Sequence, residues 1–134
     1  MKIICVGMNY AEHHKELNGD EALPKSPVIF MKPDSALLPE GESFAYPKFS
    51  NEIHYETELV LRVCRTGHNI SEDEAMTYVD AITVGIDFTA RDLQNECKVK
   101  GHPWEKAKAF DGAAVIGKLK SIKDLKNVGD IVFG

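Results

Sequence analysis

The sequence predicts an α+β domain built from short strands and a few short helices. Short apolar segments recur along the chain, and most are bounded by glycine, proline or other turn-forming residues. Capping-box patterns mark the expected starts of helices. The chain has 134 residues and 43% hydrophobic content, which is enough for one domain with a core.

The charge and the cysteines argue against several partners and locations. The 16 basic and 21 acidic residues give a net charge of -5, and no basic run with interleaved aromatics occurs, so no nucleic-acid partner is expected. The longest apolar stretches are far too short to span a bilayer, so no membrane association is expected. Cys5, Cys64 and Cys97 are odd in number and lack Cys-x-x-Cys spacing, which fits a reduced, cytoplasmic compartment.

The first elements are a strand, a helix and a second strand. A short apolar segment at residues 2–6 predicts the first strand. Asn9 and Glu12 form a capping-box pattern, so a helix is expected from Asn9 to Gly19, where the glycine suits its end. An apolar segment at residues 28–31 predicts a strand whose flanking prolines suit its two ends.

His13 and Glu16 lie three positions apart on the expected helix and share one of its faces. A carboxylate beside an imidazole raises the basicity of the ring and sets its tautomer. That is the minimum needed for a general base that activates water. Taken alone, the pair fits an ordinary exposed turn of helix better than a catalytic dyad.

The most informative segment is a predicted strand at residues 54–63. Side chains alternate across a strand, so Glu56 and Glu58 point to one face, roughly 7 Å apart, with His54 one step further along. Two like charges on a half-buried strand need neutralisation, and Mg2+ or Mn2+ binds carboxylate oxygens while keeping positions open for substrate. The alternative is a solvated strand face with two exposed glutamates, which the spacing alone fits better.

The middle of the chain alternates loop, helix and strand. Residues 34–51 are rich in Ser, Pro, Gly and Glu, so loop is expected there. Ser71 and Glu74 form a second capping box, which predicts a helix that runs through Val79. Residues 81–87 are apolar enough for a buried strand.

Asp87 ends this predicted strand, next to a helix that we expect Thr89 to cap and that ends near Gly101. An aspartate in such a position is well placed as a ligand, although a plain turn residue is the simpler alternative. Lys108 has small neighbours in the sequence, which would let its ammonium approach a bound anion closely. The last residues, 130–134, predict the start of another strand.

Five stretches, taken in order, resemble the fumarylacetoacetate hydrolase family, in particular its small single-domain members related to acylpyruvases and hydroxyheptadienedioate isomerases. The matching stretches are Cys5–Tyr10 with His13 and Glu16, Phe30–Pro33, His54–Leu59, Gly85–Gln94, and Lys108 with Phe110 and Asp111. A single motif of this kind is weak, but five in the family's order are specific.

The resemblance implies a mainly β fold, a mixed β-sheet roll with a few helices, which spacing alone does not specify. It implies that residues 1–134 are the N-terminal and central part of a single catalytic domain, incomplete in this chain, and that the protein is a homodimer. Relatives continue with further strands and a loop that closes the substrate pocket. We therefore expect this chain alone to fold poorly or to be inactive.

The resemblance also implies roles for particular residues. The implied ligands of one Mg2+ or Mn2+, with Ca2+ as a substitute in crystals, are Glu56, Glu58 and Asp87. The implied catalytic residues are His13 and Glu16, which activate water, and Lys108, which stabilises the developing enolate. The implied pocket-lining residues are Gln94 and Lys32. Met8 departs from the family pattern, because many relatives have a basic residue there.

The activity implied is metal-dependent hydrolysis of a carbon–carbon bond in a small β-diketo acid, such as an acylpyruvate or a fumarylacetoacetate-like substrate. Isomerisation, tautomerisation or decarboxylation of a 2-oxo or 2-hydroxy-dienoic acid of aromatic catabolism is the alternative in the same site. A non-catalytic metal-binding module is the alternative from another class.

Overall fold

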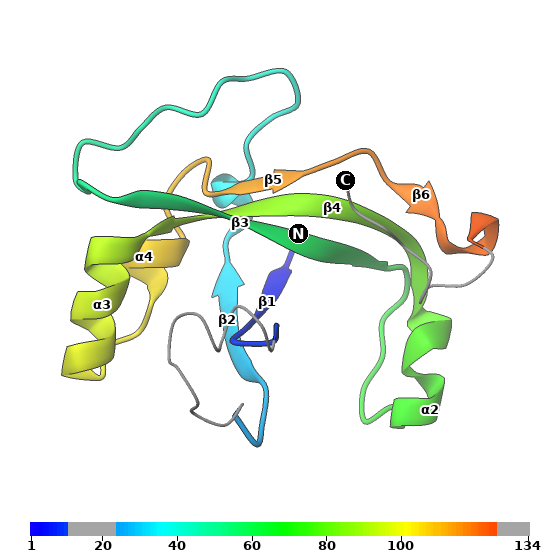
Figure 1. Cartoon of the computed structure of the whole chain (residues 1–134). Helices are drawn as coiled ribbons and strands as arrows, with labels where there is room; N and C mark the ends of the chain where they lie inside the picture. The colour runs from blue at the N-terminus through cyan, green and yellow to red at the C-terminus, as the bar shows by residue number, and fades with distance from the viewer. Residues whose placement is uncertain (11–23, 126–134) are drawn as a thin grey trace.

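The computed structural model describes residues 1–10 and 24–125, and its main feature is a long antiparallel pair of strands (Figure 1). The strands of this larger sheet are β3 (Ile53–Val63), β4 (Val79–Ala90), β5 (Ala114–Ile116) and β6 (Lys120–Ser121). Strand β4 is central, with β3 on one side and β5 and β6 on the other. All of these ladders are antiparallel, and one parallel bridge joins Leu37 to Ala114, so the sheet is mixed.

A second, two-stranded sheet runs across the direction of the first in Figure 1. It pairs β1 (Ile3–Gly7) with β2 (Val28–Lys32) in antiparallel register, with Ile3 opposite Lys32. The aromatic ring of Phe30 on β2 packs 5.8 Å from that of Trp104. The first two predicted strands are therefore confirmed, and β2 ends with the lysine that the resemblance assigned to the pocket.

The helices of the described residues are short. They are α2 (Glu72–Ala75), α3 (Arg91–Lys100) and α4 (Glu105–Lys108). Helix α3 ends at Gly101 as predicted, because that glycine adopts a left-handed conformation with φ 64° and closes the helix. The loop expected at residues 34–51 is confirmed, apart from one 3-10 turn at Asp34–Ala36.

Two predicted boundaries near α2 and α4 are wrong. The capping box of Ser71 and Glu74 is present, but α2 lasts a single turn, a 3-10 turn follows, and Val79 begins β4. Pairing between β3 and β4 overrides the helical pattern, because Val79 lies opposite Val63 in the sheet. Residues 105–108, which the sequence placed largely in a loop, form α4.

The end of β4 is also misplaced by the sequence. The strand does not stop at Asp87 but continues to Ala90, because pairing with β3 extends to Ile53 opposite Ala90. Helix α3 therefore begins at Arg91 without a side-chain cap. Thr89 lies inside the strand, where its hydroxyl accepts a hydrogen bond from Lys108 instead of capping the helix.

The described core contains few large apolar side chains. Its buried apolar residues are mostly alanines, and the largest fully buried side chains are Lys32 and Thr89. In contrast, Leu59, Leu61 and Val63 on β3 are exposed. The deepest part of the described chain is thus a polar cluster, which is unusual enough to require a chemical reason.

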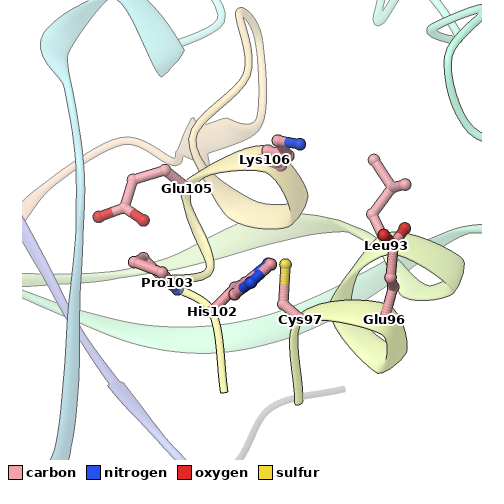
Figure 2. A pocket seen from close by; sticks show the side chains of 7 residues that line it. All are labelled: Leu93, Glu96, Cys97, His102, Pro103, Glu105 and Lys106. Carbon is pink, nitrogen blue, oxygen red and sulfur yellow. The ribbon is translucent and has the colours of Figure 1, made fainter. Parts of the chain in front are cut away.

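Several features lie outside this cluster or outside the described residues. A cavity of about 270 Å³ lies between α3 and α4 and is lined by Leu93, Glu96, Cys97, His102, Pro103, Glu105 and Lys106 (Figure 2). Within residues 1–10 and 24–125, no helix has the length and apolar character needed to cross a bilayer. The helix predicted at residues 9–19 and the strand predicted at 130–134 fall largely or wholly outside the residues that the structure describes.

Candidate metal centre

Three carboxylates converge where β3 and β4 pair. Glu56 on β3 lies directly opposite Asp87 on β4, and Glu58 follows two positions along β3. Opposite residues in an antiparallel pair, and residues two apart on one strand, share a face of the sheet. One oxygen from each of the three side chains lies within 4.8 Å of the others. The structure therefore brings together the three residues that the sequence analysis assigned as metal ligands.

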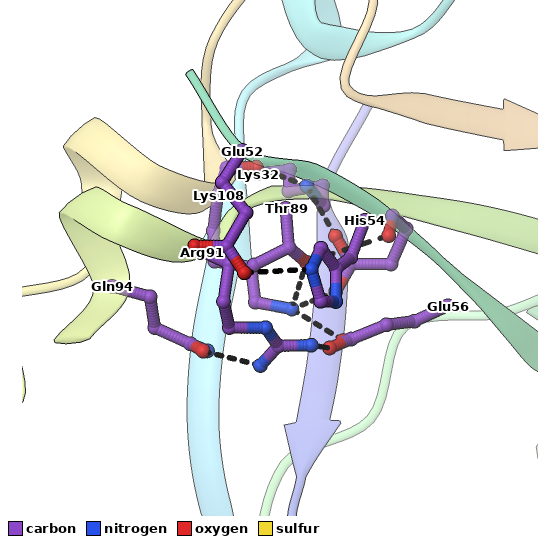
Figure 3. Close-up of polar contacts among 9 residues, drawn as sticks. Lys32, Glu52, His54, Glu56, Thr89, Arg91, Gln94 and Lys108 are labelled. Carbon is purple, nitrogen blue, oxygen red and sulfur yellow. Dashed lines mark hydrogen bonds and ion pairs between the residues drawn. The ribbon is translucent and has the colours of Figure 1, made fainter. Parts of the chain in front are cut away.

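Lys108 inserts its ammonium group between two of these carboxylates (Figure 3). It stands at the end of α4 and is only 2% exposed. Its Nζ donates to Glu56 Oε2 at 2.6 Å, to Asp87 Oδ2 at 2.7 Å and to Thr89 Oγ1 at 2.6 Å. All three ammonium hydrogens thus have acceptors, which is what a buried lysine requires.

Lys32 approaches the same cluster from β2 and is also 2% exposed. Its Nζ lies 2.7 Å from Asp87 Oδ1 and donates a hydrogen bond to the backbone carbonyl of Lys108. Asp87 Oδ1 is buried and receives no aligned hydrogen bond within the described part of the chain. This oxygen makes a close ion pair and retains a lone pair that could bind a cation.

Arg91, the first residue of α3, contacts the triad from a third side (Figure 3). Its guanidinium donates through Nη2 to Glu56 Oε1 and through Nη1 to Gln94 Oε1, the second bond at 2.6 Å. Gln94, which the sequence analysis placed in the pocket lining, is buried and orients this arginine. Arg91 and Thr89 are functional neighbours to which the sequence analysis gave no site role.

A signal for Thr89 and Arg91 exists in the sequence. Asp87 and Thr89 are two positions apart, so a strand that continued past Asp87 would have placed both on one face. Arg91 is the first residue after that strand. The misplaced strand end hid both residues.

The environment shifts the pKa values of the cluster in different directions. Burial raises the pKa of Glu58, and the nearby charges of Asp87 and Glu56 add to that rise, although a hydrogen bond from Tyr10 acts against it. Burial also acts to raise the pKa of Glu56, but Lys108 and Arg91 outweigh it, so that pKa is lowered. Burial lowers the pKa of Lys32 despite the attraction of Asp87. Glu58 is therefore the least compensated carboxylate of the triad.

The donor set suits a hard divalent cation. Carboxylate oxygens are the ligands that Mg2+ and Mn2+ prefer, and the triad offers three of them within a small space. The three carboxylates are matched by the three cations Lys32, Arg91 and Lys108, so a divalent ion would leave the cluster with a formal excess of two positive charges. Such a site is complementary to a small dianion.

Not every predicted site residue joins the cluster. His54, expected beside the two glutamates, is exposed, and its Nε2 lies 2.9 Å from Glu52 Oε1. The predicted dyad of His13 and Glu16 lies outside the described residues, so its placement stays a prediction.

Comparisons with known proteins give a consistent family. The model of the fumarylacetoacetate (FAA) hydrolase C-terminal family matches residues 2–132. The chain is 40% identical over 130 residues to an oxaloacetate tautomerase, fahd-1, mitochondrial, from Caenorhabditis elegans, a match that covers 97% of this chain and 60% of that protein.

Two solved structures share the fold. Fumarylpyruvate hydrolase from Pseudomonas aeruginosa, solved in complex with Mn2+ and pyruvate, matches with a TM-score of 0.82 and 37% identity over 92% of this chain and 55% of that one. 5-Carboxymethyl-2-hydroxymuconate delta-isomerase from Mycobacterium smegmatis matches with a TM-score of 0.75 and 30% identity over 93% of this chain and 47% of that one. The chain thus spans about half the length of the proteins it matches. The predicted fold class is confirmed.

Proposed function

The chain belongs to the fumarylacetoacetate hydrolase family, and on that premise we propose that it carries the metal centre of an enzyme that enolises small 2-oxo or β-diketo acids. The observation that carries the proposal is the triad of Glu56, Glu58 and Asp87, surrounded by an equal number of buried cations. A divalent ion there would give the site the charge that a carboxylate plus an enolate oxygen requires.

Mg2+ or Mn2+ held by the triad would supply Lewis-acid stabilisation for the oxygens of the substrate. Lys108 places a desolvated positive charge beside the position where negative charge develops as the enolate forms. Lys32 and Arg91 hold the outer oxygens of Asp87 and Glu56, which keeps those side chains in the orientation of ligands. His13, with Glu16 behind it, moves the proton.

Two reactions can follow from the same enolate. In hydrolysis of an acylpyruvate-type substrate, His13 deprotonates a water that attacks the distant carbonyl, and the enolate is the leaving group. In tautomerisation or isomerisation, the same base only shuttles a proton. The match to the fumarylpyruvate hydrolase supports the first reaction, and the match to the oxaloacetate tautomerase supports the second.

A single variant separates the two reactions. Glu16→Gln is expected to reduce hydrolysis of an acylpyruvate by about two to four powers of ten, the scale of a lost general base. The assay follows the loss of enol absorbance with Mn2+ present, beside enol–keto conversion of oxaloacetate. Glu72→Gln on α2, outside the cluster, is the matched control and should leave both rates unchanged.

Several outcomes would redirect the proposal. Near wild-type tautomerisation by Glu16→Gln, with no hydrolysis by any version of the protein, would reject the hydrolase and favour the tautomerase. Metal binding without turnover of either substrate would favour a non-catalytic metal-binding module.

The assembly and the location are further proposals. We expect a homodimer that acts on a small molecule in the cytoplasm, without a nucleic-acid or membrane partner. Light scattering would test the mass of the assembly. The relative from Caenorhabditis elegans is named as mitochondrial, so imaging of a tagged protein is needed to test the location.

A further inference from the structure

Tyr10 lies at the edge of the triad without having been assigned a role. Its hydroxyl accepts a hydrogen bond from the backbone N–H of Leu59 at 3.1 Å. Leu59 belongs to β3, which among the described strands pairs only with β4, so this donor lies on the open edge of the sheet. The tyrosine hydroxyl is therefore fixed by the backbone of the strand that carries Glu56 and Glu58.

The same hydroxyl faces Glu58, the residue before Leu59. A hydrogen bond between the two side chains opposes the effect of burial on the pKa of Glu58. A phenol has one proton and free lone pairs, so it can accept from Leu59 and donate to the carboxylate at once. The Tyr10 side chain is 43% exposed, so these two contacts, and not burial of the ring, explain its position.

Glu58 differs from its two partners in what surrounds it. Asp87 and Glu56 each contact two cationic side chains, from the set Lys32, Arg91 and Lys108. Within residues 1–10 and 24–125, no ion pair involves Glu58. A carboxylate without an outer partner could rotate among several orientations, and outer hydrogen bonds are what usually hold metal ligands in place.

We propose that Tyr10 is a positioning residue that holds the Glu58 carboxylate in the orientation of a metal ligand. The inference rests on the metal centre proposed above. It completes a pattern in which each ligand has its own outer partner: Lys32 for Asp87, Arg91 for Glu56 and Tyr10 for Glu58.

The chain contains a closely matched control for this residue. The Tyr46 hydroxyl accepts the backbone N–H of Ile53, also on β3 and also at 3.1 Å, and Tyr46 is exposed. Tyr10→Phe and Tyr46→Phe each remove one oxygen and one hydrogen bond to the same strand. Only Tyr10→Phe removes a contact with a carboxylate of the triad.

The experiment is a titration of the full chain with Mn2+, followed by the electron paramagnetic resonance signal of the free ion. Tyr10→Phe is expected to weaken Mn2+ binding by about 10- to 100-fold, the usual effect of losing an outer partner of a ligand. Tyr46→Phe is expected to bind within about twofold of the wild type. Both variants should lose the same few degrees of thermal stability, because each loses one bond to the backbone of β3.

Glu58→Gln separates failure of this inference from failure of the proposed function. If Glu58→Gln loses Mn2+ and Tyr10→Phe binds it like the wild type, the positioning role is wrong and the metal centre stands. If the two tyrosine variants weaken binding equally, the effect belongs to the strand and the positioning role is again wrong. If Glu58→Gln binds Mn2+ normally, both proposals are overturned.

Discussion

Lys108 shows how much depends on a single buried charge. An ammonium removed from water is stable only if every hydrogen has an acceptor, and here the acceptors are two carboxylates and one neutral hydroxyl. The neutral partner, Thr89, has no exposed surface. Its hydroxyl is the acceptor that does not belong to the triad, so it can hold the lysine whatever the carboxylates bind.

The first prediction concerns Thr89. Thr89→Val keeps the shape of the side chain and removes the acceptor, so kcat/KM with Mn2+ and the preferred substrate should fall by about 10- to 100-fold, the scale of one hydrogen bond to a charged group. Thr89→Ser keeps the oxygen and should remain close to the wild type. Steady-state kinetics measure both variants, with thermal unfolding as the control. Equal activity of the valine and serine variants would contradict the role of the hydroxyl.

At the scale of elements, the junction of β4 and α3 organises the site. Asp87 and Thr89 project from one face of the strand, and the chain turns into a helix at Arg91, whose guanidinium returns to the triad. The first turn of α3 is tied to the preceding loop by Asp92. This carboxylate accepts from Ser50 Oγ at 2.6 Å and from the backbone N–H of Asn51 at 3.0 Å.

The second prediction concerns the pH dependence of this tie. Hydrogen bonds from Ser50, then from the backbone of Asn51, lower the pKa of Asp92 below its ordinary 3.8. A lowered pKa in the folded state gives stability that is present above pH 3.8 and is lost as the pH falls through the lowered value. Asp92→Asn should therefore reduce the thermal midpoint at pH 7 by roughly 2 to 6 °C.

The difference between Asp92→Asn and the wild type should shrink as the pH falls below 3.8, because the wild-type carboxyl then becomes protonated. Asp73→Asn, in the first turn of α2, is the matched control. A deficit that stays constant down to the lowest measurable pH would show that ionisation of Asp92 does not matter.

At the scale of the whole molecule, the cluster joins elements that are distant in sequence. β3 and β4 supply the carboxylates, and β2, α3 and α4 supply the cations. Lys32 and Lys108, whose contact closes the cluster, are 76 positions apart. An ion bound at the triad would therefore stabilise the arrangement of the whole described fold, because it binds the folded state and not the open chain.

The third prediction follows from that linkage. At a free Mn2+ concentration a hundred times its dissociation constant, the folded state gains about 2.7 kcal/mol. The thermal midpoint should rise by roughly 10 °C in a chain of this length. Scanning calorimetry with Mn2+, and with excess chelator, measures the change. Glu58→Gln should show almost no rise, and an equal rise in that variant would place the ion elsewhere.

Sequence periodicity determined the features that depend on neighbouring residues. The alternation of a strand put Glu56 and Glu58 on one face, and the structure confirms it, because that alternation is a property of the extended backbone itself. The capping box at Ser71 and the stop at Gly101 are local in the same sense. The roll itself and the addition of Asp87 to the ligand set came from likeness to a family, not from periodicity.

Only the tertiary structure decided how the acidic cluster is neutralised. Nothing near Lys32 or Lys108 in the sequence marks them as buried, and nothing near Tyr10 marks it as a neighbour of Glu58. These contacts arise when sheet pairing and helix packing bring separate segments together, and the same pairing lengthened β4 beyond its apolar pattern. Burial and partner choice depend on the whole fold, so a local pattern cannot contain them.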